Sequence, residues 1–95
     1  MNTVFKGKKI TDEMIKRVIY EFDRRYQHTN DYEQWLEKDS YKFALKYAEK
    51  LYPPKHILSE ASGISTTKFN GGEQTNRVFR ELGFNVIDKP RWHGR

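Results

Sequence analysis

The chain has 95 residues, which is enough for one domain with a modest core. Its 18 Lys and Arg outnumber 13 Asp and Glu, so the formal net charge is +5, and aromatic residues make up 15% of the chain. The lack of cysteine excludes disulfides and thiolate chemistry. No apolar run reaches membrane-spanning length and no apolar signal segment opens the chain, so we expect a cytoplasmic protein with no membrane partner. The positive charge is compatible with a nucleic-acid partner, although many small basic proteins bind none.

The first nine residues are basic, with three lysines around Gly7. They could form an arm that lies against phosphates, but a solvated, frayed terminus is the commoner outcome for such a segment. Val4 and Phe5 leave a third possibility, a short edge strand. We therefore treat residues 1–9 as a basic N-terminal arm outside the domain.

Residues 11–26 have the pattern of a long amphipathic helix. Thr11 is of the type that caps a helix N-terminus, and Asp12 and Glu13 suit the positive end of the helix dipole. Apolar side chains recur at helical spacing and predict the buried face, which consists of Ile15, Val18, Ile19, Phe22 and Tyr26.

A polar turn at residues 27–30 precedes a short helix. Asn30 and Glu33 form a capping-box pattern, and the helix that it opens carries Trp35 and Leu36.

Residues 41–52 fit two structures. Apolar residues alternate with lysines at first, which predicts half-buried strands. The alanines, leucines, lysines and glutamates of the same segment favour a helix by propensity. A hairpin here would turn at residues 48–50 without a glycine, which is unusual, so the residues alone leave both structures open.

The most informative stretch is residues 51–87. Two prolines follow Tyr52, and Pro54 suits the first position of a helix, where its missing N–H is not needed. The pattern then predicts a short helix over residues 56–61, which ends at Gly63.

The loop over residues 65–72 carries one large apolar residue, Phe69, which we expect to enter the core. A further helix begins near Glu73 and ends at Gly83, where Phe84 can pack back against it as in a Schellman motif. A strand that begins at Phe84 closes the domain. The buried face of this helix is predicted to consist of Val78, Phe79 and Leu82, with Thr75 at its edge.

The segments YPPK, HIL, FNGG and EQTNRVFRELGFNV, in this order, resemble the N-terminal head domain of ScoMcrA-type restriction endonucleases. These are modification-dependent HNH enzymes, and the similarity spans roughly residues 10–88. The resemblance implies a hairpin at residues 41–52 and a module that engages DNA. The chain does not contain the SRA-like, sulfur-binding and HNH parts of those enzymes, so we expect no DNA cleavage by that route.

The residues show no assembled catalytic group. His28, His56 and His93 are far apart and have neither HNH-like nor metal-ligand spacing. Gly71 and Gly72 belong to neither a dinucleotide-binding nor a Walker pattern. We therefore expect no enzyme activity, no cofactor and no metal.

The polar face of the helix that begins near Glu73 has side chains suited to DNA. Arg, Asn and Gln pair with guanine and adenine edges in the major groove, and a lysine with glycine amides before a helix suits a phosphate. Without the resemblance, a solvated amphipathic helix would be the commoner explanation. The predicted set is Lys68, Arg77 and Arg80 for affinity, Gln74 and Asn76 for base contacts, and Lys55, Gly71 and Gly72 beside phosphates.

The sequence therefore predicts a small α+β domain over residues 10–88. It would contain a long N-terminal helix, a β-hairpin, a helix–loop–helix and a closing strand in a winged-helix-like arrangement, followed by a basic tail at residues 89–95 in which Trp92 either stacks on a base or folds back. The function it favours is binding of double-stranded DNA, including modified DNA. The alternative is a small phage or defence-system module that binds a larger protein, such as a nuclease subunit, and does not read DNA.

Overall fold

A computed structural model of the chain describes residues 1–26, 32, 34–35 and 42–89. The described strands form a two-stranded antiparallel sheet, β1-β2, and a three-stranded antiparallel sheet in the order β4-β3-β5. The predicted α+β class is confirmed, whereas the winged-helix likeness stays a prediction. In chain order the elements are β1 (Asn2–Phe5), β2 (Lys8–Thr11), α1 (Asp12–Tyr26), β3 (Phe43–Tyr47), β4 (Lys50–Tyr52), α3 (Pro54–Ser62), the 3₁₀ turn η1 (Thr66–Lys68), α4 (Glu73–Glu81) and β5 (Asn85–Asp88).

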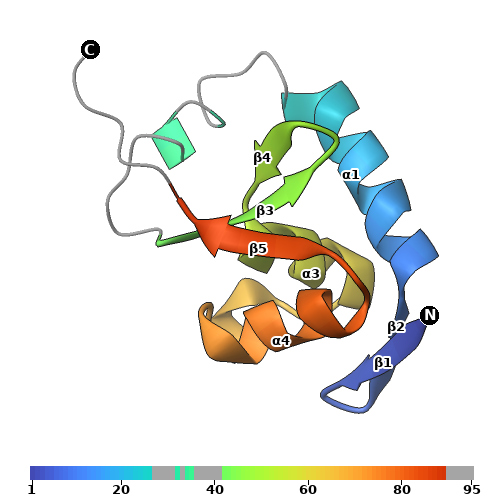
Figure 1. The fold of residues 1–95 in the computed structure, drawn as a ribbon. Coiled ribbons are helices and arrows are strands. Elements are labelled where there is room, and N and C mark those ends of the chain that lie inside the picture. Colours follow the sequence, from blue (N-terminus) through green and yellow to red (C-terminus); the bar gives the residue numbers. More distant parts are fainter. Residues whose placement is uncertain (27–31, 33, 36–41, 90–95) are drawn as a thin grey trace.

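As drawn in Figure 1, the helices α1, α3 and α4 lie beside, behind and below the three-stranded sheet. α1 runs along one side of the molecule, from the β1-β2 hairpin to the β3-β4 hairpin, and α4 lies below the sheet as drawn. α1 packs against α3, while α4 packs against β1 and β5. The core between these elements contains Phe5, Ile10, Ile15, Ile19, Phe22, Leu45, Tyr52, Ile57, Leu58, Phe69, Val78, Phe79, Leu82 and Phe84.

The start of α1 is capped as the sequence predicts. The backbone N–H of Met14 donates to Thr11 Oγ1 at 3.1 Å, which satisfies one of the amides that have no partner within the helix. The buried face contains Ile15, Ile19 and Phe22. The apolar stripe that the sequence predicts therefore faces the core.

Residues 1–9 are not an arm outside the domain. β1 and β2 form an antiparallel hairpin, and Phe5 is 1% exposed. The Phe5 ring meets the Phe69 ring edge-on, with 5.0 Å between centroids. The expected frayed terminus is wrong and the strand through Val4 and Phe5 is correct, because burial of one ring against a distant loop outweighs the solvation of the lysines around it.

Residues 41–52 contain the hairpin and not the helix. Tyr47 pairs with Lys50, so the turn is Ala48-Glu49, one residue shorter than expected. Ala48 has φ 52° and Glu49 has φ 66°. Two left-handed residues in a two-residue loop are the mark of a type I′ turn, for which Asn-Gly is the usual sequence. The hairpin thus forms with unfavourable turn residues, and this is why the residues alone did not predict it.

α3 begins and ends at the predicted signals. Pro54 is its first residue, as predicted, and the helix includes the expected range 56–61. At the C-terminus Gly63 has φ 76°, and its N–H donates to Ser59 O at 2.8 Å. Ile57 and Leu58 are fully buried.

α4 ends in the predicted Schellman motif. The N–H of Phe84 donates to Phe79 O at 2.9 Å, and the N–H of Gly83 donates to Arg80 O at 3.0 Å. The rings of Phe79 and Phe84 pack edge-on with 6.3 Å between centroids. This contact sets the direction in which the chain enters β5.

Several predictions lie outside the described residues. They are the capping box at Asn30 and Glu33, the place of Leu36 on a short helix, and the tail that carries Trp92. Trp35 lies within the described residues and is buried.

Tyr52 joins the sheet to α1. Its side chain is 2% exposed, and its hydroxyl donates to the Asp23 carboxylate at 3.0 Å from Oδ1 and 3.1 Å from Oδ2. Its ring packs edge-on against Phe22, with 5.6 Å between centroids. Burial, and after it the hydrogen bond to Asp23, raises the pKa of Tyr52 well above its ordinary value of 10.

We expect Tyr52 to make the folded state less stable at high pH. Its contribution is present below the unfolded pKa and is lost as pH rises from about 10 toward the folded pKa, since only the unfolded chain then releases the proton. The loss approaches about 1.4 kcal/mol per pH unit. Tyr52→Phe should lower the free energy of unfolding by about 1 kcal/mol near neutral pH but remove this part of the alkaline decline. Urea unfolding at several alkaline pH values measures the free energy of unfolding of the wild type and of Tyr52→Phe. If this free energy falls equally with pH in the two proteins, Tyr52 is not the cause of the decline.

The Ala48-Glu49 turn predicts a stabilising substitution. Glu49→Gly should raise the free energy of unfolding by about 0.5–1 kcal/mol, because glycine adopts the left-handed conformation without the Cβ clash. For a chain of this size that is a rise in Tm of about 4 °C. Lys46→Gly, in the extended backbone of β3, is the matched control and should lower Tm. If both variants shift Tm in the same direction, the turn does not carry the strain.

Candidate nucleic-acid interface

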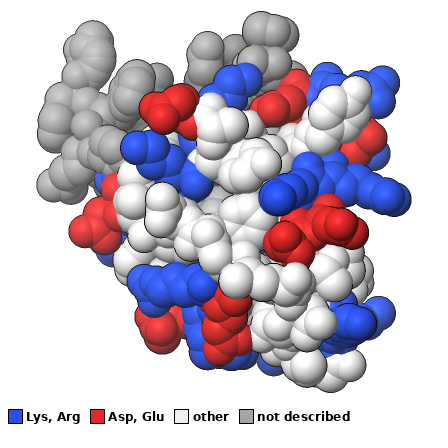
Figure 2. All heavy atoms as spheres, turned by 45° about the vertical axis from the view of Figure 1, so that its right-hand side comes forward, with Lys and Arg blue, Asp and Glu red and all other residues white. Residues whose placement is uncertain are grey.

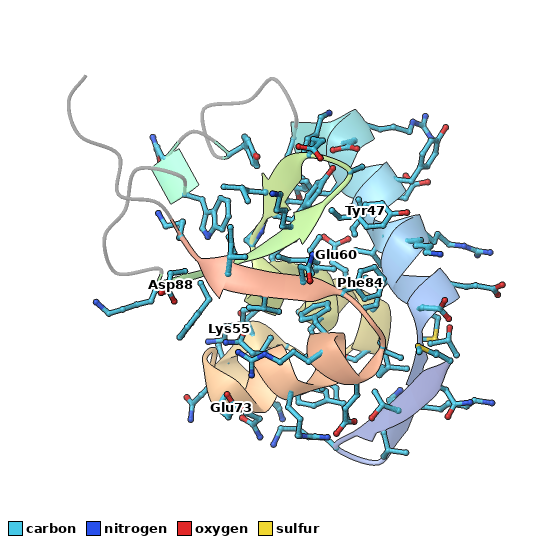
Figure 3. All side chains as sticks on the ribbon, viewed as in Figure 1. Tyr47, Lys55, Glu60, Glu73, Phe84 and Asp88 are labelled. Carbon is cyan, nitrogen blue, oxygen red and sulfur yellow. The ribbon has the colours of Figure 1, made fainter. Side chains whose placement is uncertain are left out.

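The loop before α4 places two glycines at the start of the helix, beside a lysine of α3. Gly72 occupies the N-cap position with φ 81° and ψ −143°, a conformation that side-chain-bearing residues rarely adopt. A Cβ on Gly71 would lie 4.0 Å from Lys55 Cδ, so the Lys55 stem runs beside the loop. Lys55 Nζ lies 5.7 Å from the centroid of the Phe69 ring. Figure 3 shows Lys55 between β5 and α4.

Side chains of α4 hold this loop in place. The N–H of Asn70 donates to Gln74 Oε1 at 3.1 Å, and Thr75 Oγ1 donates to Asn70 O at 2.8 Å. Gly72 provides no side-chain cap for the N–H groups of the first turn of α4. A base contact by Gln74 has to compete with its hydrogen bond to Asn70.

The two arginines of α4 are engaged in exposed ion pairs. Arg77 Nη1 lies 3.0 Å from Glu81 Oε2, and Arg80 Nη1 lies 3.1 Å from Glu73 Oε1. The hydroxyl of Thr3 also donates to Glu81; this hydrogen bond, and after it the one from Arg77, lowers the pKa of Glu81. Exposed pairs contribute only about 0–1 kcal/mol, so both guanidinium groups can exchange their carboxylates for phosphates.

Asn76 does not lie on the exposed face of α4. Asn76 is 1% exposed, and among the described residues its Oδ1 has no hydrogen-bond partner. The expectation that it contacts bases from an exposed polar face is therefore wrong. α4 packs against α3 as well as β1 and β5, so its buried arc is wider than its apolar residues indicate. A buried amide oxygen without a partner costs about 1–3 kcal/mol, and natural proteins rarely keep one without a use.

A half-open hollow of about 810 Å³, which we call the aromatic hollow, lies beside the starts of β3, α3 and α4 and the end of α1. Of the predicted set, it is lined by Lys55, Gly71, Gly72 and Asn76. Lys68, Gln74, Arg77 and Arg80 are exposed and do not line it. Its aromatic lining residues within the described part of the chain are Phe22, Tyr26, Tyr32, Trp35, Phe43 and His56.

Phe22 is the centre of this aromatic wall. The centroid of its ring is 4.9 Å from that of Tyr26, 5.8 Å from that of Tyr32 and 5.5 Å from that of His56. Phe22 itself is buried, whereas Tyr26, Tyr32 and Phe43 are half-buried. Sequence reasoning placed Phe22 and Tyr26 in the core and missed the hollow. The high aromatic content was its only signal, because the convergence of the rings depends on long-range packing.

The charges at the aromatic hollow have one sign among the described residues. Lys42 is exposed and Lys55 half-buried, and no Asp or Glu is found in the described lining. His56 Nε2 lies 2.7 Å from Glu60 Oε2, a carboxylate outside the lining, but this contact lacks the geometry of a hydrogen bond. On the face drawn in Figure 2, basic and acidic side chains alternate around an uncharged centre. That face has the mixed charge of an ordinary protein surface.

Within the described ranges, no group of three or more His, Asp or Glu could hold a metal ion. No helix there is both long enough and apolar enough to cross a membrane. No protein-family model, curated protein or solved structure matches the chain. The chemistry of the residues themselves therefore carries the functional argument.

The unpartnered amide of Asn76 predicts that its removal stabilises the domain. Asn76→Leu should raise the free energy of unfolding by about 1 kcal/mol, because an apolar side chain of similar size has no hydrogen bond to lose. Thr75→Val is the matched control on the neighbouring buried position and should lower it by about 1 kcal/mol, since Thr75 donates to Asn70. Chemical denaturation measures both. A loss of stability in Asn76→Leu as large as that in Thr75→Val would show that the amide has a structural partner.

Proposed function

We propose that this protein is a module that binds double-stranded DNA. The observation that carries the proposal is the group of phosphate-binding features at the start of α4. Lys55 runs beside Gly71, the first turn of α4 has no side-chain cap, and no carboxylate is found in the described lining of the adjoining hollow. Free backbone N–H groups at a helix N-terminus together with a lysine suit a phosphate.

The exposed cations of η1 and α4 would extend the contact along the DNA backbone. Lys68 has no carboxylate partner within the described residues, and Arg77 and Arg80 have only exposed ones. Phosphates offer the same bidentate geometry to guanidinium groups as the carboxylates that they would replace. Binding of this kind should be strongly salt-dependent, because each neutralised phosphate releases counterions.

The resemblance to the head domains of modification-dependent endonucleases supports modified DNA as the substrate class. In this proposal the module supplies DNA engagement, and a larger protein such as a nuclease subunit would supply cleavage. A role confined to protein binding is the competing function, and the DNA-binding measurement below separates the two.

Fluorescence anisotropy with matched unmodified, cytosine-methylated and phosphorothioated duplexes over a salt series tests the proposal. We expect affinity to fall steeply with salt. The double variant Arg77→Glu with Arg80→Glu should weaken binding and reduce the slope of log K against log salt by about 2, one for each lost phosphate contact.

The control is Arg17→Glu with Arg24→Glu on α1, which changes the net charge equally, and circular dichroism verifies folding of both variants. If the two double variants lose DNA affinity equally, the loss is explained by net charge and not by contacts of Arg77 and Arg80. If no duplex binds even at low salt, the DNA-binding proposal fails and the protein-binding function becomes the better one.

A further inference from the structure

Asn76 provides the first clue to what occupies the aromatic hollow. It lines the hollow, it is 1% exposed, and its Oδ1 has no hydrogen-bond partner in the part of the chain that the structure describes. A side-chain amide can donate as well as accept, so a ligand edge with an N–H donor beside an acceptor complements it. Adenine and cytosine have such edges, and pairing between Asn and adenine is a recurrent form of base recognition.

The half-buried rings provide the second clue. Tyr26, Tyr32 and Phe43 are half-buried and line the hollow together with the buried Phe22. Aromatic rings of this kind stack on nucleobases, and enzymes and readers that take a base out of a duplex hold it between such rings. The volume of about 810 Å³ lies within the range of pockets that enclose a small ligand.

The third clue is the position of the phosphate-binding features. Lys42 and Lys55 are the lysines of the described lining, and the Gly71-Gly72 backbone forms another part of the same lining. α3 and α4 both contribute residues at their N-termini, and neither helix has a side-chain cap. A ligand with a flat polar ring and a phosphate attached to it would meet all of these groups at once.

We propose that the aromatic hollow receives a single base, adenine or cytosine, extruded from duplex DNA. The ring would stack on Tyr26, Tyr32 or Phe43, its amino edge would bind Asn76, and its phosphate would lie at Lys55 and the Gly71-Gly72 amides. The proposal rests on the proposed function, since the base belongs to bound DNA. The base has to leave the helix because a side chain as buried as Asn76 cannot reach a base edge in a groove.

The test compares duplexes that differ at one position. One duplex carries an unpaired cytosine opposite a mismatched base, and the matched duplex has an abasic site there, which gives similar deformability without a base to capture. Because unpairing makes extrusion cheap, we expect the wild-type chain to bind the mismatched duplex about tenfold more tightly than the abasic one. Fully paired duplex should bind more weakly than the mismatched one for the same reason.

Two variants connect the preference to the hollow. Asn76→Leu should abolish the difference between the mismatched and abasic duplexes and leave the residual affinity for both. Phe43→Leu keeps an apolar residue in β3 but removes the ring. It should reduce the difference in affinity between the two duplexes while Asn76 is still present. In contrast, Arg77→Glu with Arg80→Glu should weaken both complexes by similar factors, because those residues do not line the hollow.

The outcomes separate this inference from the proposed function. Salt-dependent duplex binding with no preference for the base over the abasic site would overturn base capture and leave DNA binding standing. An unchanged preference in both Asn76→Leu and Phe43→Leu would also overturn it, since the preference would then arise elsewhere. Binding of free dCMP or dAMP that Asn76→Leu abolishes, without binding of any duplex, would overturn both proposals and make the hollow a nucleotide site.

Discussion

The contact of Tyr52 with α1 is the interaction on which the rest of the domain depends. Tyr52 is the last residue of β4, opposite Leu45 in the sheet, and its hydroxyl reaches Asp23. Its ring also packs on Phe22, which forms the back of the aromatic hollow. One side chain therefore joins the sheet, α1 and the wall of the candidate site.

The residues after Tyr52 extend this constraint to α3. Pro53 and Pro54 restrict the backbone as it leaves β4, and Pro54 starts the helix at once. The direction of α3 is thus set within two residues of the buried tyrosine. Because Lys55 and His56 follow immediately, their places at the hollow are set by the same short connection.

The parts of the fold that could be predicted are those in which neighbouring residues carry their own signal. The cap at Thr11, the start at Pro54 and the Schellman end at Gly83 each depend on a few adjacent residues. The β1-β2 hairpin could not be predicted in this way, because its stability depends on Phe5 meeting Phe69 from a distant loop. The prediction that Asn76 is exposed was wrong for a related reason. A polar residue at the edge of an apolar stripe is normally expected on the exposed face, but α4 packs against other elements on two sides and this buries Asn76. The hollow itself needs five elements to converge, and no local pattern encodes that.

The helix starts that lack a side-chain cap lie at the aromatic hollow, as does the unpartnered Asn76. α1 has a side-chain cap at Thr11, whereas α3 and α4 begin at Pro53 and Gly72 without one. A serine or aspartate would normally stabilise such helix starts, and an apolar residue would be better placed than Asn76. Natural chains keep unsatisfied groups mainly where a ligand satisfies them, since stability is otherwise easily improved. The strained Ala48-Glu49 turn cannot be explained by a ligand in this way, because neither residue belongs to the described lining of the hollow. The uncapped start of α4 and the unpartnered Asn76 Oδ1 lie beside one cluster of rings, and the nucleotide unit that we propose there would satisfy both.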